Sequence, residues 1–239
     1  MFSKNYEIKY HEIDTQMVLK PSVLFEYLED IAAKNADTIG FGYDDITRRG
    51  YAWFLLKYTM EFSNYPQNIL GLKIETEPRG ANRLFAYRDF AIKDGENDVI
   101  GRVNSTWGLI DINTKSMVNP QTAFPQMAPL EKREDDLKYT KIPAITELSA
   151  EKTFHVRYDD IDVNQHVNNS NYILWAFEAL PIEFRSSKKL KKLDLTYKKE
   201  VKYGNNIVSK VQITDNTTIH VIKNASTDEE LCSILAQWV

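Results

Sequence analysis

The sequence contains an internal repeat, and this feature constrains the fold more than any other. Residues 6–30 align without a gap on residues 154–178, an offset of 148 residues. Apolar and polar side chains alternate at the start of both copies, and apolar side chains then recur every third or fourth residue. These two periods are typical of a half-buried strand followed by a helix with one face in a core. The repeat therefore predicts two structural units of the same design.

Each copy continues as a helix and then about four strands. Pro21 suits the first turn of the first helix and Gly40 follows its end, while Pro181 stops the second helix. The strand candidates are residues 52–62, 72–78, 84–92 and 99–112 in the first copy and residues 191–201, 206–214, 217–223 and 231–239 in the second. Because a helix followed by antiparallel strands must bury its apolar face against their sheet, we expect an α+β fold.

The helix or its connection to the next strand is longer in the first copy. Residues 52–62 align on 191–201 with an offset of 139 residues, nine fewer than the offset of the opening strands. Residues 119–152 hold four of the eight prolines and a mixed charge run, which is typical of a linker. We therefore expect units at residues 1–118 and 153–239. The two units would need to pair to cover their remaining apolar surface.

Composition and charge exclude several classes of protein. The chain has 30 basic and 34 acidic side chains, so it lacks the positive charge of a general nucleic-acid binder. Cys232 is the only cysteine, and the four histidines form no cluster at metal-ligand spacing, so we expect neither a metal nor a bound cofactor. No stretch reaches the roughly 20 apolar residues of a membrane span, and the N-terminus lacks the apolar core of a secretory signal. We expect a cytoplasmic protein.

The turn before the second helix has an unusual polar sequence. It reads DVNQHVNN over residues 162–169 and is followed by Tyr172, Trp175 and the stretch EALP. Together with LTYKKE, which ends at Glu200, this motif resembles the acyl-acyl carrier protein (acyl-ACP) thioesterases. The resemblance implies a tandem, or double, hotdog fold, in which two long central helices pack on curled antiparallel sheets. It covers essentially the full chain.

The resemblance also implies a reaction and a site. The reaction is hydrolysis of the thioester that links a fatty acyl chain to the phosphopantetheine arm of ACP. The family's working residues fall on Asp162, Asn164, His166 and Glu200. Plant members often have a cysteine directly after the glutamate, but Val201 stands here, which leaves attack by water as the route.

These residue types suit thioester hydrolysis on chemical grounds. The reaction needs a base for the attacking water and hydrogen-bond donors for the oxyanion. Either His166 or Glu200 can be the base, Asp162 can hold a neighbouring group, and Asn164 can position water or the carbonyl. The start of the following helix offers unpaired N–H groups and the positive end of a dipole.

Structural roles compete with catalytic ones at several positions. Asn168, Asn169 and Asn171 are expected to be helix caps and turn formers. Glu200 aligns with Glu61, so the two glutamates could share a structural role on the outer face of a strand. His166 aligns with Val18 and Asn164 with Gln16, so the first copy keeps the turn without its chemistry. We therefore expect one active site per chain.

Partners and substrates follow from the same resemblance. Lysines near the second helix and its next strand form either a solvated surface or a patch that steers acidic ACP; they are Lys188, Lys189, Lys191, Lys192, Lys198 and Lys199. The alternatives are an acyl-CoA thioesterase of the same fold, a non-catalytic acyl-thioester sensor, or a hydratase. Side chains such as Trp53, Phe54, Met60 or Trp107 could limit the length of the acyl chain. Both a monomer and a homodimer are compatible with the duplication.

Overall fold

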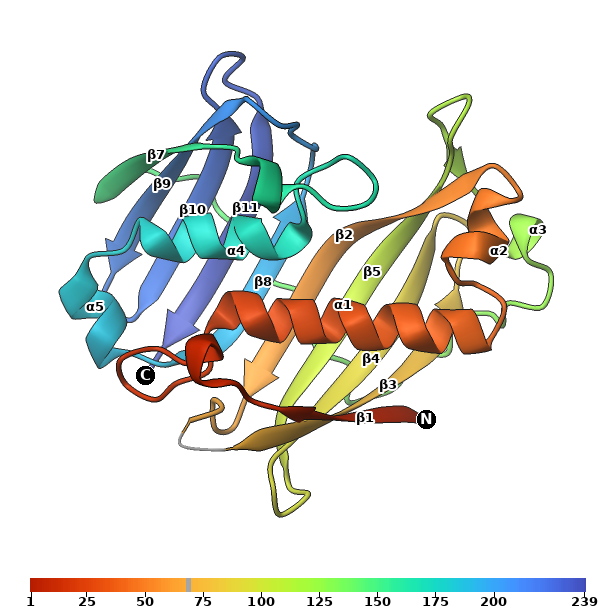
Figure 1. The fold of residues 1–239 in the computed structure, drawn as a ribbon, viewed down its shortest axis with the longest axis horizontal. Coiled ribbons are helices and arrows are strands. Elements are labelled where there is room, and N and C mark those ends of the chain that lie inside the picture. Colours follow the sequence, from red (N-terminus) through yellow and green to blue (C-terminus); the bar gives the residue numbers. More distant parts are fainter. Residues whose placement is uncertain (68–69) are drawn as a thin grey trace.

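The computed structural model describes residues 1–67 and 70–239, and their strands form one antiparallel sheet of 11 strands. The first repeat has the predicted order of a strand, a helix and a run of strands (Figure 1). Its elements are β1 (Phe2–Glu7), the 3-10 helix η1 (Tyr10–Glu12), α1 (Pro21–Thr38), α2 (Tyr43–Thr47), β2 (Tyr51–Phe62), β3 (Gly71–Ala81), β4 (Phe85–Lys93), β5 (Val99–Asp111) and β6 (Met117–Val118).

The second repeat has the same order after the short helix α3 (Pro120–Ala123). Its elements are β7 (Ala150–His155), the 3-10 helix η2 (Tyr158–Asp160), α4 (Asn169–Glu178), α5 (Ile182–Ser187), β8 (Leu190–Tyr197), β9 (Asn206–Thr214), β10 (Thr217–Asn224) and β11 (Glu230–Trp238). The prediction of an α+β fold is confirmed.

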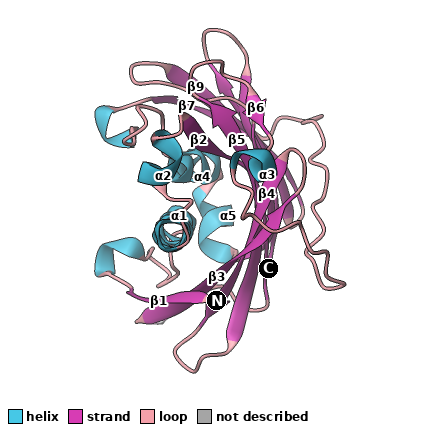
Figure 2. Ribbon diagram, turned by 90° about the vertical axis from the view of Figure 1, so that its right-hand side faces the viewer, coloured by secondary structure: helices cyan, strands magenta, loops and turns pink. Residues whose placement is uncertain are grey.

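The two repeats join edge to edge through β2 and β8. The strand order is β1-β3-β4-β5-β2-β8-β11-β10-β9-β7, with β6 beside β5. At the junction Met60 pairs with Leu193, and both side chains are fully buried. α1 and α4 lie next to each other on one face of the sheet, which curls around them (Figures 1 and 2). Apolar residues of both repeats belong to one buried cluster.

The two central helices occupy equivalent places but differ in length. α1 has 18 residues and α4 has 10, and this difference of eight residues accounts for all but one of the nine by which the two offsets differ. Pro21 is the first residue of α1, and Gly40 follows the helix with a φ of 77°, a conformation that favours glycine. α4 ends at Glu178, and the chain continues beyond Pro181 as α5. Within residues 1–67 and 70–239, none of the helices combines the length and apolar character needed to cross a membrane.

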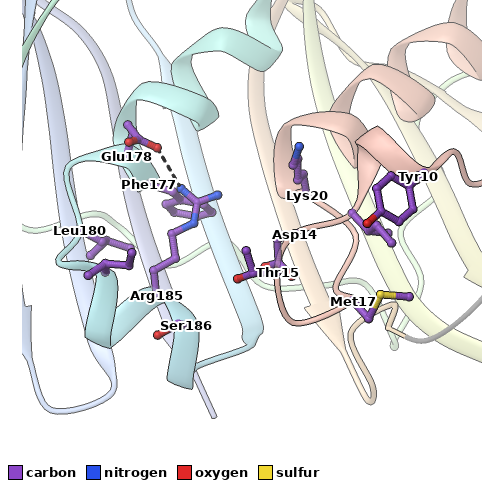
Figure 3. A pocket seen from close by; sticks show the side chains of 12 residues that line it. Tyr10, Asp14, Thr15, Met17, Lys20, Phe177, Glu178, Leu180, Arg185 and Ser186 are labelled. Carbon is purple, nitrogen blue, oxygen red and sulfur yellow. Dashed lines mark ion pairs between the residues drawn. The ribbon is translucent and has the colours of Figure 1, made fainter.

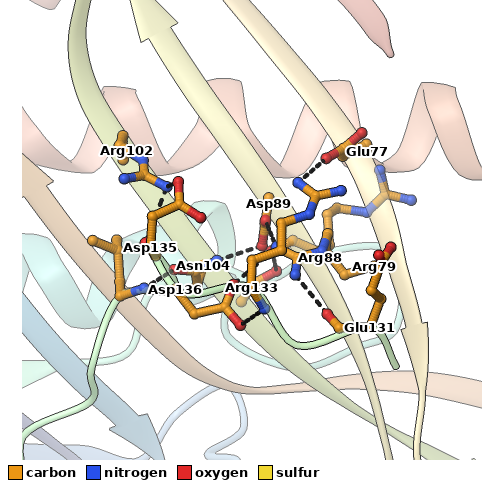
Figure 4. Close-up of polar contacts among 12 residues, drawn as sticks. Glu77, Arg79, Arg88, Asp89, Arg102, Asn104, Glu131, Arg133, Asp135 and Asp136 are labelled. Atoms are coloured by element: carbon orange, nitrogen blue, oxygen red, sulfur yellow. Dashed lines mark hydrogen bonds and ion pairs between the residues drawn. The ribbon is translucent and has the colours of Figure 1, made fainter. Parts of the chain in front are cut away.

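The segment between the repeats is fastened to the sheet. Arg79 of β3, whose side chain is 4% exposed, pairs with Asp89 of β4 and with Asp136 of the segment, the latter at 3.0 Å (Figure 4). Further ion pairs in the same region join Arg133 to Glu77 and Arg102 to Asp135. The charges that predict a solvated linker therefore hold this segment against the first repeat. β7 begins inside the range predicted to be linker.

Candidate active site

The polar turn before α4 is folded around the carboxylate of Asp162. Oδ1 of Asp162 accepts hydrogen bonds from the backbone N–H of Asn164 at 2.8 Å and of His166 at 3.3 Å. Oδ2 accepts a third hydrogen bond from Nδ2 of Asn164 at 3.3 Å. Gln165 has a positive φ of 64°, which closes the turn. Asp162 therefore holds the backbone that presents Asn164 and His166.

His166 and Glu200 face each other next to this turn. Nε2 of His166 lies 2.8 Å from Oε2 of Glu200, and the side chains are 31% and 39% exposed. Burial raises the pKa of the Glu200 carboxyl; His166 opposes this shift and Asp162 adds to it. The backbone N–H of Val167 donates to the carbonyl of Val201 at 3.2 Å, which ties the turn to the loop that carries Glu200. The structure thus brings the predicted pair into direct contact.

Glu200 does not lie on a strand, so the prediction of a strand over residues 191–201 is wrong at its end. β8 stops at Tyr197, because the N–H groups of Lys198 and Lys199 both donate to the carbonyl of Leu231 and the regular ladder ends there. Glu61, the aligned glutamate, stays within β2 and pairs with Lys192 at 2.8 Å. The two glutamates therefore have different partners and no shared structural role.

Two asparagines at the start of α4 fix the helix. Oδ1 of Asn168 accepts from the backbone N–H of Ser170 at 2.9 Å, as a helix cap does. Nδ2 of Asn171 donates to the carbonyl of Asp160 at 3.1 Å. The predicted structural role is confirmed for both. Asn169, in contrast, lines the cavity next to the turn.

A cavity of about 930 Å³ connects the turn with the interior of the first repeat. Its wall includes all four predicted site residues. It also includes small side chains of α1 and parts of α2, β2, β4 and β5. Three of the side chains considered as limits of an acyl tunnel line it, namely Trp53, Phe54 and Trp107. Met60 is fully buried in the sheet and does not line this cavity.

The sequence analysis missed Arg88, which lies in the wall of this cavity. Nη1 of Arg88 donates to Oδ1 of Asn35 at 2.7 Å and to Oγ1 of Thr76 at 3.1 Å. Burial lowers the pKa of the guanidinium to about 10. A signal was available, because Arg88 shares the inward face of β4 with Ala86 and Phe90.

Glu29 of α1 is the second charged side chain that the sequence analysis missed. It lines the cavity, and its Oε2 lies 3.4 Å from Nδ2 of Asn168. Its signal in the sequence is weaker: Glu29 precedes Ala32, Ala33 and Ala36 at the spacing of one helix face. Small side chains on that face leave room beside a carboxylate.

A second cavity, of about 570 Å³, lies between the turn of the first repeat and the end of α4 (Figure 3). Its wall includes Asp14, Lys20 and Phe177, and none of the predicted site residues. Arg185 of α5 also lines it and pairs with Glu178 at 3.7 Å. No histidine lines this cavity. Among residues 1–67 and 70–239, no group of His, Cys, Asp and Glu side chains is arranged to hold a metal ion.

Both parts of the chain match models of one protein family. The acyl-ACP thioesterase N-terminal domain matches residues 1–122, and the C-terminal domain of the same family matches residues 144–239. Oleoyl-acyl carrier protein thioesterase 2 of Arabidopsis thaliana, a chloroplastic protein, is 23% identical over 99% of this chain and 76% of its own length. A chloroplastic acyl-[acyl-carrier-protein] hydrolase of Cuphea viscosissima is 25% identical over 84% of this chain, which spans 52% of that relative.

A solved structure has the same fold. The crystal structure of an acyl-ACP thioesterase from Bacteroides thetaiotaomicron superposes with a TM-score of 0.88 and 22% identity, over 100% of this chain and 97% of that one. The resemblance carried by the turn motif is thereby confirmed. With family models matched over residues 1–122 and 144–239, the chain belongs to the acyl-ACP thioesterase family.

Proposed function

We propose that this protein hydrolyses the thioester of fatty acyl-ACP and releases a free fatty acid and the carrier protein. One observation carries the proposal: the cavity that holds the His166–Glu200 pair is also lined by apolar side chains of the first repeat. Aromatic and aliphatic walls suit an acyl chain, and the polar pair suits the thioester. Membership of a family of thioester hydrolases supports the same reaction.

In this proposal His166 is the general base. When Nε2 of His166 donates to Glu200, Nδ1 is the ring nitrogen that can accept a proton from water. The water oxygen attacks the carbonyl carbon, the C–S bond breaks, and the proton passes from His166 to the leaving thiolate. Glu200 orients the ring; the reverse assignment, with Glu200 as the base, is the alternative.

Donors for the oxyanion are available on the same side of the turn. Nδ2 of Asn164 uses one N–H for Asp162, so its second N–H can polarise the thioester carbonyl. The first turn of α4 adds the positive end of a helix dipole. Asp162 contributes by holding the turn in shape.

The double hotdog architecture is part of the proposal. Two central helices on a shared curled sheet support two tandem units, at residues 1–118 and 153–239 with a linker between them. The family domains at residues 1–122 and 144–239 support the same division. His166 lies in the second unit, and Val18 stands at the aligned position of the first, which gives one active site per chain.

The positions of the lysines on β8 reduce the proposed ACP-docking patch to part of the predicted one. β8 has eight residues, so its two ends are about 25 Å apart. Lys188, Lys189 and Lys191 belong to the end far from Glu200, whereas Lys199 lines the cavity. We therefore propose that acidic ACP approaches the end of β8 that carries Lys198 and Lys199. The cytoplasmic location and the homodimer stay predictions.

The decisive experiment measures the release of free thiol from acyl-ACP substrates of increasing chain length. The parent protein and a His166→Ala variant are assayed side by side. We expect hydrolysis by the parent and a loss on the order of 10² or more in the variant, because general-base catalysis contributes about that much. Normal hydrolysis by the variant would remove His166 from the mechanism.

Acyl-CoA substrates in the same assay test the alternatives. We expect faster turnover of acyl-ACP, because only the carrier protein can use a surface around Lys198 and Lys199. Equal turnover of acyl-CoA would favour an acyl-CoA thioesterase. Binding of these thioesters without release of thiol would favour the non-catalytic sensor.

A further inference from the structure

Glu29 brings a carboxylate from the first repeat to the active site of the second. Its Oε2 is 3.4 Å from Nδ2 of Asn168, the residue that caps α4. Its Oε1 is buried and has no hydrogen-bond partner among residues 1–67 and 70–239. Oε1 makes no hydrogen bond that a proton would have to displace, although the Asn169 amide favours the ionised carboxylate, so this oxygen is the one that can take up a proton from the cavity.

The surroundings of Glu29 raise the pKa of its carboxyl toward neutral pH. Burial is the main cause that raises the pKa of Glu29 to about 7; the amides of Asn169 and Asn168 oppose it. The ionisable groups that face Glu29 come from its own helix, the catalytic turn, β2 and β8: they are Glu26, Asp162, Tyr58 and Tyr197. The cations in the cavity wall are Arg88, Lys115 and Lys199, and none of them is among the causes that shift the pKa of Glu29. The carboxyl therefore changes its charge near neutral pH.

We propose that Glu29 is a positioning residue of the active site, and that its ionised carboxylate holds Asn168 and through it the start of α4. The proposal rests on the thioester hydrolysis proposed above. Asn168 connects the helix to the turn, since its N–H donates to the carbonyl of Asp160 and its side chain caps Ser170. His166 is two residues away. A contact that holds Asn168 in place therefore also holds the nearby backbone that carries His166.

The charge of Glu29 sets how firmly Asn168 is held. An ionised carboxylate is a stronger acceptor than a protonated one. As the pH falls through neutrality, protonation of Oε1 weakens the contact with Asn168, and the histidine is less well placed. We expect kcat to fall with little change in KM, because the acyl-binding wall of the cavity is unaltered.

The test compares kcat and KM for one acyl-ACP between pH 5 and 9. The variants are Glu29→Gln, which keeps the shape and an acceptor but cannot titrate, and Glu29→Ala, which removes the contact. Glu26→Gln is the matched control: Glu26 is one turn earlier on α1, its Oε1 lies 3.5 Å from Ser170 Oγ, and it does not line the cavity.

In the parent, loss of activity at low pH should follow the uptake of two protons, one by Glu29 and one by the base. In Glu29→Gln it should follow a single proton, with kcat at pH 8 about threefold below the parent, because a neutral amide oxygen is a weaker acceptor than an ionised carboxylate. Glu29→Ala should lose kcat by about tenfold at every pH, since small misplacements of catalytic groups are costly. Glu26→Gln should keep the two-proton dependence, with a small shift to lower pH, because the Glu26 charge helps to raise the pKa of Glu29.

Two outcomes overturn the proposal and are distinguishable. If the parent hydrolyses acyl-ACP and Glu29→Gln keeps the parent pH profile, Glu29 has no positioning role. If the parent releases no thiol, the proposed function fails first and this inference fails with it. Should Glu29→Ala not fold, the isosteric Gln variant alone decides.

Discussion

The turns of the two repeats have the same backbone and different side chains. Oδ1 of Asp14 accepts from the N–H groups of Gln16 at 2.8 Å and Val18 at 3.0 Å. Oδ1 of Asp162 makes the corresponding contacts with Asn164 and His166. The shared aspartate is therefore a folding element in both repeats. The chemistry lies in the residues that differ.

The walls opposite the two turns differ as well. The turn of the second repeat faces α1, which presents Glu29, and the two share the cavity of about 930 Å³. The turn of the first repeat faces the end of α4, which presents Phe177, the residue aligned with Glu29, in a cavity of about 570 Å³. The proposed active site thus combines the turn of the second repeat with a helix face of the first.

The strongest test of this comparison converts one turn into the other. His166→Val copies Val18 of the first repeat, and we expect thiol release from acyl-ACP to fall by a factor on the order of 10² or more. The double variant His166→Val/Val18→His, measured in the same assay, moves the histidine to the turn of the first repeat. We expect no recovery, because that turn carries Gln16 in place of Asn164, and Phe177 rather than Glu29 faces it. Recovery of activity would mean that a histidine on either turn is sufficient.

The second test separates folding from chemistry at the shared aspartates. Asp14→Ala and Asp162→Ala should each lower the free energy of unfolding by about 1 kcal/mol, because each removes hydrogen bonds from two N–H groups of a turn. Only Asp162→Ala should also lower kcat, by about 10- to 100-fold, since it releases His166. Urea denaturation and thiol release measure the two effects. Equal loss of activity in both variants would contradict the comparison.

The third test fills one cavity at a time. Ala36 of α1 lines the larger cavity, and Ala36→Leu should lower kcat/KM for the longest acyl chains by about fourfold per excluded methylene, at about 0.8 kcal/mol each. Short chains should be unaffected. Ser186→Leu in the wall of the smaller cavity is the matched control and should leave the chain-length profile unchanged. A shift in both variants would show that the acyl chain is not confined to the larger cavity.

The sequence predicts the fold well because its signals are local. Alternation and helical spacing mark the strands and both central helices, and Pro21 and Gly40 mark where α1 begins and ends. The end of β8 is missed because the residues after Tyr197 continue a strand-like pattern. The chain leaves the sheet there through two hydrogen bonds to a single carbonyl on β11, which no local pattern reveals.

The candidate site also combines residues that a local motif reveals with one that only the tertiary fold brings into place. Asp162, Asn164 and His166 stand within five residues, so a motif finds them. Glu29 is more than 130 positions earlier in the chain, and its place beside Asn168 depends on how α1 lies against α4. The pairing of β2 with β8 brings these helices together. A residue whose role arises from tertiary contact between the repeats carries little signal of its own.

The smallest expected effect is a change in stability at Glu29. A raised carboxyl pKa means that the folded state binds more protons than the unfolded state between the ordinary glutamate pKa and about 7. The free energy of unfolding therefore falls as the pH rises through that window, and Glu29→Gln removes this loss. At pH 8 we expect the variant to melt about 2–4 °C above the parent, or about 1 kcal/mol in a chain of this size, since water in the cavity screens part of the burial. At pH 5 the two melting temperatures should converge. A constant difference for Glu29→Gln across the range would mean that its carboxyl does not titrate there.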